Sequence, residues 1–139
     1  MPRVTADTNI YVSALTTGRA NPYAFLQLAR AGKIRLAVSD AILNEVAEVL
    51  ERKFGWPQED IAAARDQIEQ FAEKVKPAVS LESVKADPDD DRILECASSA
   101  KSDYIVSGDK HLLRLGQRNS IRVLNVADFL QRQAKGQGR

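Results

Sequence analysis

Short apolar runs typical of β-strands alternate with stretches of helical periodicity along this chain. Strand-like runs cover residues 3–6, 34–38, 104–107 and 121–124, and a weaker one covers residues 78–81. Between them, apolar residues recur at the three- and four-residue steps of amphipathic helices. Strands separated by helices predict an α/β fold, a three-layer α/β/α sandwich with a mainly parallel central sheet.

Glycine, proline and capping residues mark where the helices are expected to begin and end. One helix starts at Ile10 and is interrupted at Gly18, and the next opens at Pro22 and stops at Gly32. The remaining predicted helices cover residues 40–53, 58–76, 89–100 and 110–115, with a last one from 125–127 to 133. We expect residues 1–133 to form one domain and residues 134–139 a flexible tail.

The composition excludes few functions. The 139 residues are 44% hydrophobic, enough for one core, and 20 Lys and Arg against 19 Asp and Glu give a net charge of +1. This balance argues neither for nor against nucleic-acid binding, which would need a local patch. The single cysteine, Cys96, excludes an intramolecular disulfide, and we expect it in the core. Without a membrane-length apolar run or a signal peptide, we expect a cytoplasmic protein with no membrane partner.

Acidic residues gather where strands end and helices begin. Asp7 directly follows the first strand, and Asp109 follows the strand that ends at Ser107. Glu45 lies early in the helix predicted at 40–53, and an acidic run, 87–91, leads into the helix predicted at 89–100. Because the carboxyl ends of parallel strands meet at one edge of a sheet, we expect these carboxylates to approach one another there.

Neighbouring carboxylates with no nearby cation cannot all stay ionised, and a divalent metal most simply supplies the missing charge. Hard oxygen ligands suit Mg²⁺ or Mn²⁺, which can activate water against a phosphodiester. Single acids also have simpler explanations: Asp40, Asp89 and Asp109 are good helix caps, Asp87 can begin a turn, and Asp91 suits a first helical turn. Periodicity does not separate Glu45 from Glu51; only the position of Glu45 near the helix start favours it.

Four segments, in order, resemble the motifs of PIN-domain (PilT N-terminus) proteins, and the resemblance covers residues 3–130. The segments are Val4-Thr5-Ala6-Asp7-Thr8-Asn9, then Ser39-Asp40-Ala41-Ile42-Leu43-Asn44-Glu45-Val46, then residues 87–97, and then residues 103–113. The similarity is closest to the branch of toxin components of toxin–antitoxin systems. It implies an α/β/α fold, Mg²⁺- or Mn²⁺-dependent cleavage of an RNA substrate, a homodimer and a small antitoxin partner.

The resemblance also implies roles for individual residues. Its acids correspond to Asp7, Glu45, Asp109 and one of two neighbours, Asp90 or Asp91, of which the spacing favours Asp91. Asp7 and Asp109 would hold the metal with that third acid, and Glu45 would orient or deprotonate the attacking water. Two further positions, Asn9 and Ser107, match residues that orient the acids or the scissile phosphate.

Cations near these motifs are candidates for phosphate contacts. Lys110, Arg114, Arg118 and Arg122 form one group in the sequence, and Arg30, Lys33 and Arg35 form another, although a solvated face is the simpler explanation of both. His111, the only histidine, is expected at the surface rather than in catalysis. Two alternatives to a nuclease are a PIN-like module that binds RNA or protein without cutting and a phosphoryl-transfer domain. The dehalogenase type of the latter is disfavoured because Asn9 stands where it requires a second acid.

Overall fold

The computed structural model describes residues 1–77, 88–118 and 120–137, and for residues 88–90, 118 and 137 the description is confined to the backbone. These residues form a six-stranded sheet in the order β3-β2-β1-β4-β6-β5. The strands are β1 (Arg3–Ala6), β2 (Arg35–Val38), β3 (Ala72–Lys74), β4 (Tyr104–Val106), β5 (Gln117–Arg118) and β6 (Ile121–Leu124). All neighbours pair in parallel except β5, which is antiparallel to β6. The predicted α/β class with a mainly parallel sheet is confirmed.

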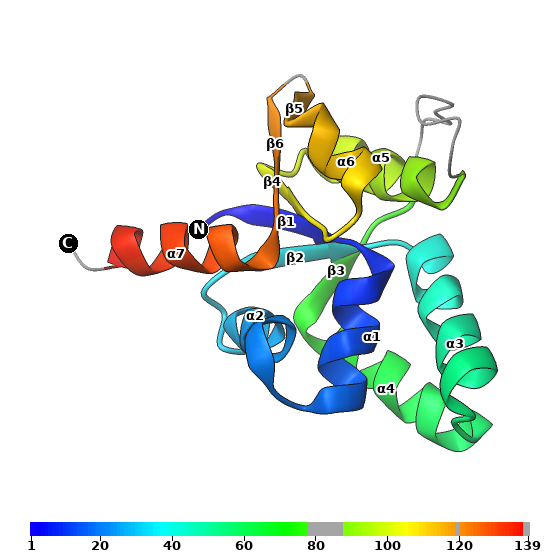
Figure 1. Cartoon of the computed structure of the whole chain (residues 1–139). Coiled ribbons are helices and arrows are strands. Elements are labelled where there is room, and N and C mark those ends of the chain that lie inside the picture. The colour runs from blue at the N-terminus through cyan, green and yellow to red at the C-terminus, as the bar shows by residue number, and fades with distance from the viewer. Residues whose placement is uncertain (78–87, 119, 138–139) are drawn as a thin grey trace.

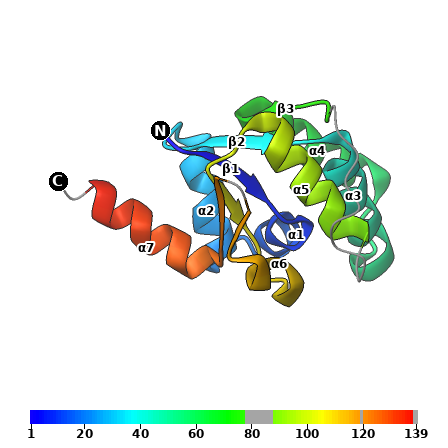
Figure 2. The ribbon, with the colours of Figure 1, turned by 90° about the horizontal axis from the view of Figure 1, so that it is seen from above.

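Helices cover both faces of this sheet. They are α1 (Thr8–Thr17), α2 (Ala20–Arg30), α3 (Asp40–Phe54), α4 (Gln58–Phe71), α5 (Pro88–Ala100), α6 (Lys110–Leu115) and α7 (Val126–Gln137). In Figure 1, α1, α2 and α4 lie on one side of the sheet, and α5 and α6 lie on the other. Figure 2 shows the N-terminus and helix α7 at the end of the molecule opposite α3. No described helix is long and apolar enough to span a bilayer.

The core follows the apolar periodicity of the sequence. On α3, the buried residues Ile42, Leu43, Val46, Val49 and Leu50 recur at three- and four-residue steps. The ring of Phe129 on α7 lies between those of Phe25 and Tyr104, with centroids 5.5 Å from each. These edge-to-face contacts pack α7 onto α2 and the start of β4, and add to the apolar area that the rings bury.

The prediction of one helix over residues 58–76 is wrong after Phe71. Helix α4 ends at Phe71, and the next three residues form β3, whose Ala72 pairs with Leu36 of β2. The amide of Val75 then donates to the carbonyl oxygen of Val38 at 2.8 Å. The open edge of β2 therefore takes a segment whose apolar spacing alone favoured helix. The weak strand predicted at 78–81 lies outside the described residues.

Other differences are smaller. Strand β5 was not predicted, because two residues are too few for a periodic signal. Helix α7 runs to Gln137, four residues beyond its predicted end, and Asn125 caps its start by accepting from the amide of Asp128 at 2.8 Å. Ser39, rather than Asp40, caps α3, because its Oγ accepts from the amide of Ile42 at 3.3 Å. The remaining strands and helices lie within a few residues of their predicted bounds.

Candidate functional site

Asp7 and Ser107 lie side by side where β1 and β4 end. Ala6 pairs with Val106 in the last register position of these strands, and the amide of Asp7 donates to the carbonyl oxygen of Val106 at 2.9 Å. The next residues along each strand, Asp7 and Ser107, therefore stand next to each other at the carboxyl edge of the sheet. Both are buried, Ser107 completely and Asp7 to 7% exposure.

The hydroxyl of Ser107 joins two of the predicted site acids. Its Oγ donates to Oδ2 of Asp7 at 2.6 Å, and it accepts from the backbone amide of Asp109 at 2.9 Å. The first bond is short because its acceptor is a carboxylate. One serine thus fixes the side chain of Asp7 and the backbone position of Asp109 together.

The surroundings of Asp7 disfavour the ionised form of its carboxyl group. Burial raises its pKa above the ordinary value of 3.8, and the nearby charge of Asp109 raises it further, while the hydrogen bond from Ser107 lowers it. The amides of Asn9 and Thr8 also lower the pKa, although Asp7 makes no side-chain capping bond to α1. A nearby cation would favour the ionised form and relieve this cost.

Asp109 serves as the N-cap of α6. Its Oδ1 accepts from the amide of His111 at 2.7 Å and from that of Leu112 at 3.3 Å. The capping explanation for this residue is therefore correct, and it does not exclude a second role. Both bonds use Oδ1, and Oδ2 makes no hydrogen bond to any residue that the structure describes.

Helix α5 carries two buried acids. Asp91, in its first turn, is 5% exposed, and Glu95, one turn later, is 7% exposed. The helix packs on β1 and ends at Ala100, shortly before β4 begins, so its first turn lies toward the carboxyl edge. The side chain of Asp90, the alternative third acid, lies outside the described residues.

The sequence analysis did not predict that the acidic side chain of Glu95 would be buried. Its Oε1 lies 2.7 Å from Nε of Arg92, an ion pair that lacks the angles of a hydrogen bond. Its spacing from Asp91 could have indicated this burial, because a residue four positions after Asp91 falls on the same face of a helix.

Glu45 differs from the other acids of α3. It is half-buried, whereas Glu48 and Glu51 are exposed, and Glu51 accepts from the side chain of Gln58 at 2.8 Å. The two residues thus differ in burial, a difference that the apolar periodicity of the helix did not reveal.

The residues predicted to contact substrate are accessible. Asn9 and Lys110 are exposed in the first turns of α1 and α6, respectively. His111 is exposed, as expected for a surface residue. Cys96 is fully buried and makes a long contact, 3.9 Å, with the hydroxyl of Thr5.

The predicted cation groups are divided by the fold. Arg122 is the second residue of β6, where it pairs with Tyr104, the first residue of β4, so it lies toward the amino edge. Arg35 begins β2 and pairs with Arg3 at that same edge. Arg122 lines a hollow there of about 520 Å³ together with Asp103. Lys110 and Arg114, both on α6, follow the carboxyl end of β4.

The donor set fits a divalent cation in part. Within the described ranges, no three Asp, Glu, His or Cys side chains are grouped closely enough to hold a metal ion. Ser107 links the side chain of Asp7 to the backbone of Asp109, and no third ligand is gathered with them among the side chains that the structure describes. However, Mg²⁺ is commonly held by one or two carboxylates, with water and substrate phosphate completing its shell. Two neighbouring carboxylates, one with a raised pKa, meet that requirement.

Comparisons with known proteins agree with this architecture. A chain in the crystal structure of VapBC2 from Rickettsia felis bound to a DNA fragment from their promoter is similar, with a TM-score of 0.65. The two chains share 16% sequence identity over 88% of this chain and 98% of that chain, a level that supports the shared fold. No curated protein matches. The family model described as PIN domain matches residues 3–111. The chain therefore belongs to the PIN domain family.

Proposed function

We propose that this protein is a divalent-metal-dependent endoribonuclease of the cytoplasm. The observation that carries the proposal is the Ser107 hydroxyl, which links Asp7 and Asp109 at the carboxyl edge. The family match supports it, because the PIN domain resemblance implies RNA cleavage with Mg²⁺ or Mn²⁺.

Asp7 and Asp109 would hold the metal ion, and Asp91 would complete its shell directly or through water, with Asp90 as the alternative. When bound, the metal supplies charge stabilisation and a water of lowered pKa. Ser107 keeps one oxygen of Asp7 in place. Glu45 orients the attacking water or takes its proton, and Asn9 and Lys110 position the scissile phosphate. A histidine is not needed in this scheme.

We further propose that the protein is the toxin of a toxin–antitoxin pair, acts as a homodimer and is bound by a small antitoxin. The similarity to a chain of the VapBC2 structure supports this role. Co-purification with the product of a neighbouring reading frame would test it, and a chain that elutes alone from cells expressing both would contradict it.

The experiment for the nuclease is incubation with a panel of RNAs in Mg²⁺, in Mn²⁺ and in chelator. We expect cleavage with metal by the wild type, none in chelator and none by Asp7→Asn, with circular dichroism showing that this variant folds. Cleavage that Asp7→Asn leaves unchanged would remove the mechanism.

A module that binds RNA or protein without cutting is the second candidate. The absence of a three-acid metal group among the described residues favours it. RNA binding without metal-dependent products in the same assay would establish this alternative.

A further inference from the structure

A hollow also lies on the carboxyl edge, two strands away from Asp7. It has a volume of about 330 Å³ and lies between the start of α3 and the end of β3. Its lining comprises Ser39, Asp40, Ala41, Lys74, Val75, Lys76 and Pro77. We call it the β3 hollow. None of its residues is among the acids assigned to the metal site.

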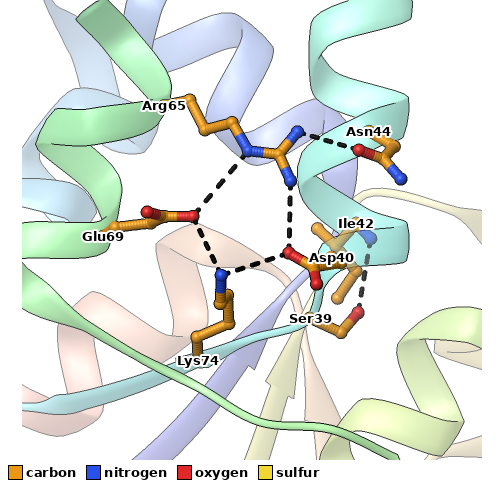
Figure 3. A network of polar contacts seen from close by, with 7 residues as sticks. All are labelled: Ser39, Asp40, Ile42, Asn44, Arg65, Glu69 and Lys74. Carbon is orange, nitrogen blue, oxygen red and sulfur yellow. Dashed lines mark hydrogen bonds and ion pairs between the residues drawn. The ribbon is translucent and has the colours of Figure 1, made fainter. Parts of the chain in front are cut away.

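The negative charge of Asp40, the acid in the β3 hollow, is balanced by ion pairs with two basic side chains. Oδ1 of Asp40 lies 3.2 Å from a guanidinium nitrogen of Arg65 and 3.5 Å from Nζ of Lys74 (Figure 3). Glu69 contacts the same two cations, at 3.7 Å and 3.5 Å. Arg65 also donates to Oδ1 of Asn44 at 2.8 Å. Two positive and two negative side chains thus form a closed network whose charges cancel.

Lys76 remains outside this network. It is exposed, and none of the acids in the described ranges lies within ion-pair distance of it. Val38 pairs with Lys74 and the amide of Val75 bonds to the carbonyl oxygen of Val38, so Lys76 projects just past the last paired residue of β3. With the charges of Asp40 and Glu69 cancelled, Lys76 gives the described lining of the β3 hollow a net positive charge.

This charge lies on the opposite side of Asp7 from the cations of α6. The sheet order puts β2 and then β3 on one side of β1, and β4, which α6 follows, on the other. Neighbouring strands are about 4.8 Å apart, so β3 lies roughly 10 Å from the strand that carries Asp7. A polyanion crossing the acidic edge needs cations on both sides of it. Lys110 and Arg114 supply them on α6, and Lys76 supplies one by β3.

We propose that the β3 hollow binds a phosphate of single-stranded RNA, with Lys76 as its principal cation. The RNA strand runs along the carboxyl edge from α6 to β3, across Asp7. The Arg65–Asp40–Lys74–Glu69 network keeps the charge of Asp40 from repelling that phosphate. This inference rests on the proposed ribonuclease function and extends it to the path of the substrate.

The test compares Lys76→Gln with a matched control, Lys53→Gln, an equally simple charge removal at an exposed lysine in the last turn of α3. Binding of a fluorescein-labelled single-stranded RNA is followed by anisotropy in Mg²⁺, in an Asp7→Asn background that leaves the RNA intact. We expect Lys76→Gln to weaken binding roughly three- to tenfold at low salt and Lys76→Glu to weaken it further. Loss of one phosphate contact should also reduce the slope of log K against log salt by about 0.7.

Kinetics of the wild-type and Lys76→Gln proteins give an independent readout. The lost phosphate contact would bind the substrate and the transition state equally, so KM should rise in Lys76→Gln while kcat is unchanged. If RNA is cleaved but Lys76→Gln equals Lys53→Gln in salt slope and KM, the hollow is not a phosphate site and the nuclease proposal stands. If the wild type neither binds nor cleaves RNA, the ribonuclease proposal fails, and this inference fails with it.

Discussion

The Oγ of Ser107 lies 2.6 Å from Oδ2 of Asp7, although the two residues are 100 positions apart in the chain. Parallel pairing of β1 with β4 produces this contact, because it ends both strands at the same level. The bond fixes the orientation of a buried carboxylate that has few other partners. Ser107 is therefore the residue on which the geometry of the candidate site most depends.

Replacing Ser107 with alanine removes this donor. We expect Ser107→Ala to lower the free energy of unfolding by about 1–3 kcal/mol, because a buried carboxylate loses its hydrogen bond. RNA cleavage should fall roughly 10- to 100-fold, the range for a lost partner of a metal ligand. Urea unfolding and initial cleavage rates measure the two effects.

Ser102→Ala is the control for this variant. The Ser102 hydroxyl is also buried and lies 2.9 Å from Oγ1 of Thr5, near the amino end of β4 and away from the acids. Ser102→Ala should lower the free energy of unfolding by a similar amount, while the cleavage rate per folded molecule stays that of the wild type. Full activity in Ser107→Ala would show that the contact with Asp7 has no role in catalysis.

Asp7 should destabilise the metal-free protein at neutral pH. Its pKa is raised in the folded state, so ionisation costs folding free energy above that pKa. Below the unfolded value near 3.8, the carboxyl is protonated in both states and the cost disappears. In chelator, Asp7→Asn should therefore be more stable than wild type at pH 7, and the difference should shrink as the pH falls toward 4.

Urea unfolding of both proteins at a series of pH values measures this difference. Asp66→Asn, which changes an exposed acid on α4, is the matched control and should show no comparable gain. Mg²⁺ should raise the melting temperature of the wild type and leave that of Asp7→Asn unchanged. An Asp7→Asn variant that is less stable than wild type at pH 7 would contradict the assigned electrostatic strain.

Most of the fold followed from local sequence patterns. Strands β1, β2, β4 and β6 are short apolar runs, and α3 shows its core stripe directly, so periodicity was sufficient for them. Asp7 and Asp109 were found for a related reason, because they follow strands whose carboxyl ends meet. Their neighbour Ser107 was found only through the family resemblance.

The features that sequence did not predict depend on tertiary contacts. Strand β3 forms because β2 has an open edge, which no local pattern around Ala72 reveals. Arg122 is only 13 residues from Asp109 in the chain, yet the segment between them, which includes α6, returns to the opposite edge, where β6 begins. The pairing of Asp40 with Arg65 and Lys74 likewise joins three separate elements. Sequence proximity is a poor guide to proximity in a parallel sheet, because each crossover changes edges.

The third acid of the site can be identified by two single substitutions. Asp91 is buried in the first turn of α5, which lies toward the carboxyl edge of the sheet. We expect Asp91→Asn to reduce metal-dependent cleavage by more than about 100-fold, beyond the usual loss from an indirect partner. Asp90→Asn should stay within roughly threefold of wild type. Initial rates over a Mg²⁺ titration measure both, and the reverse result would transfer the role to Asp90.

Cys96 should report on opening of the core around α5. Burial raises the pKa of its thiol to about 11, while hydrogen bonds from Thr5 and Ser39 lower it. Thiolate is the reactive form, so the folded protein should react slowly with DTNB at pH 8 and rapidly in urea. The unfolded thiol ionises near 9.0, so stability should fall from pH 9 toward 11 in wild type more than in Cys96→Ala. Rapid stoichiometric labelling of folded protein would contradict this burial.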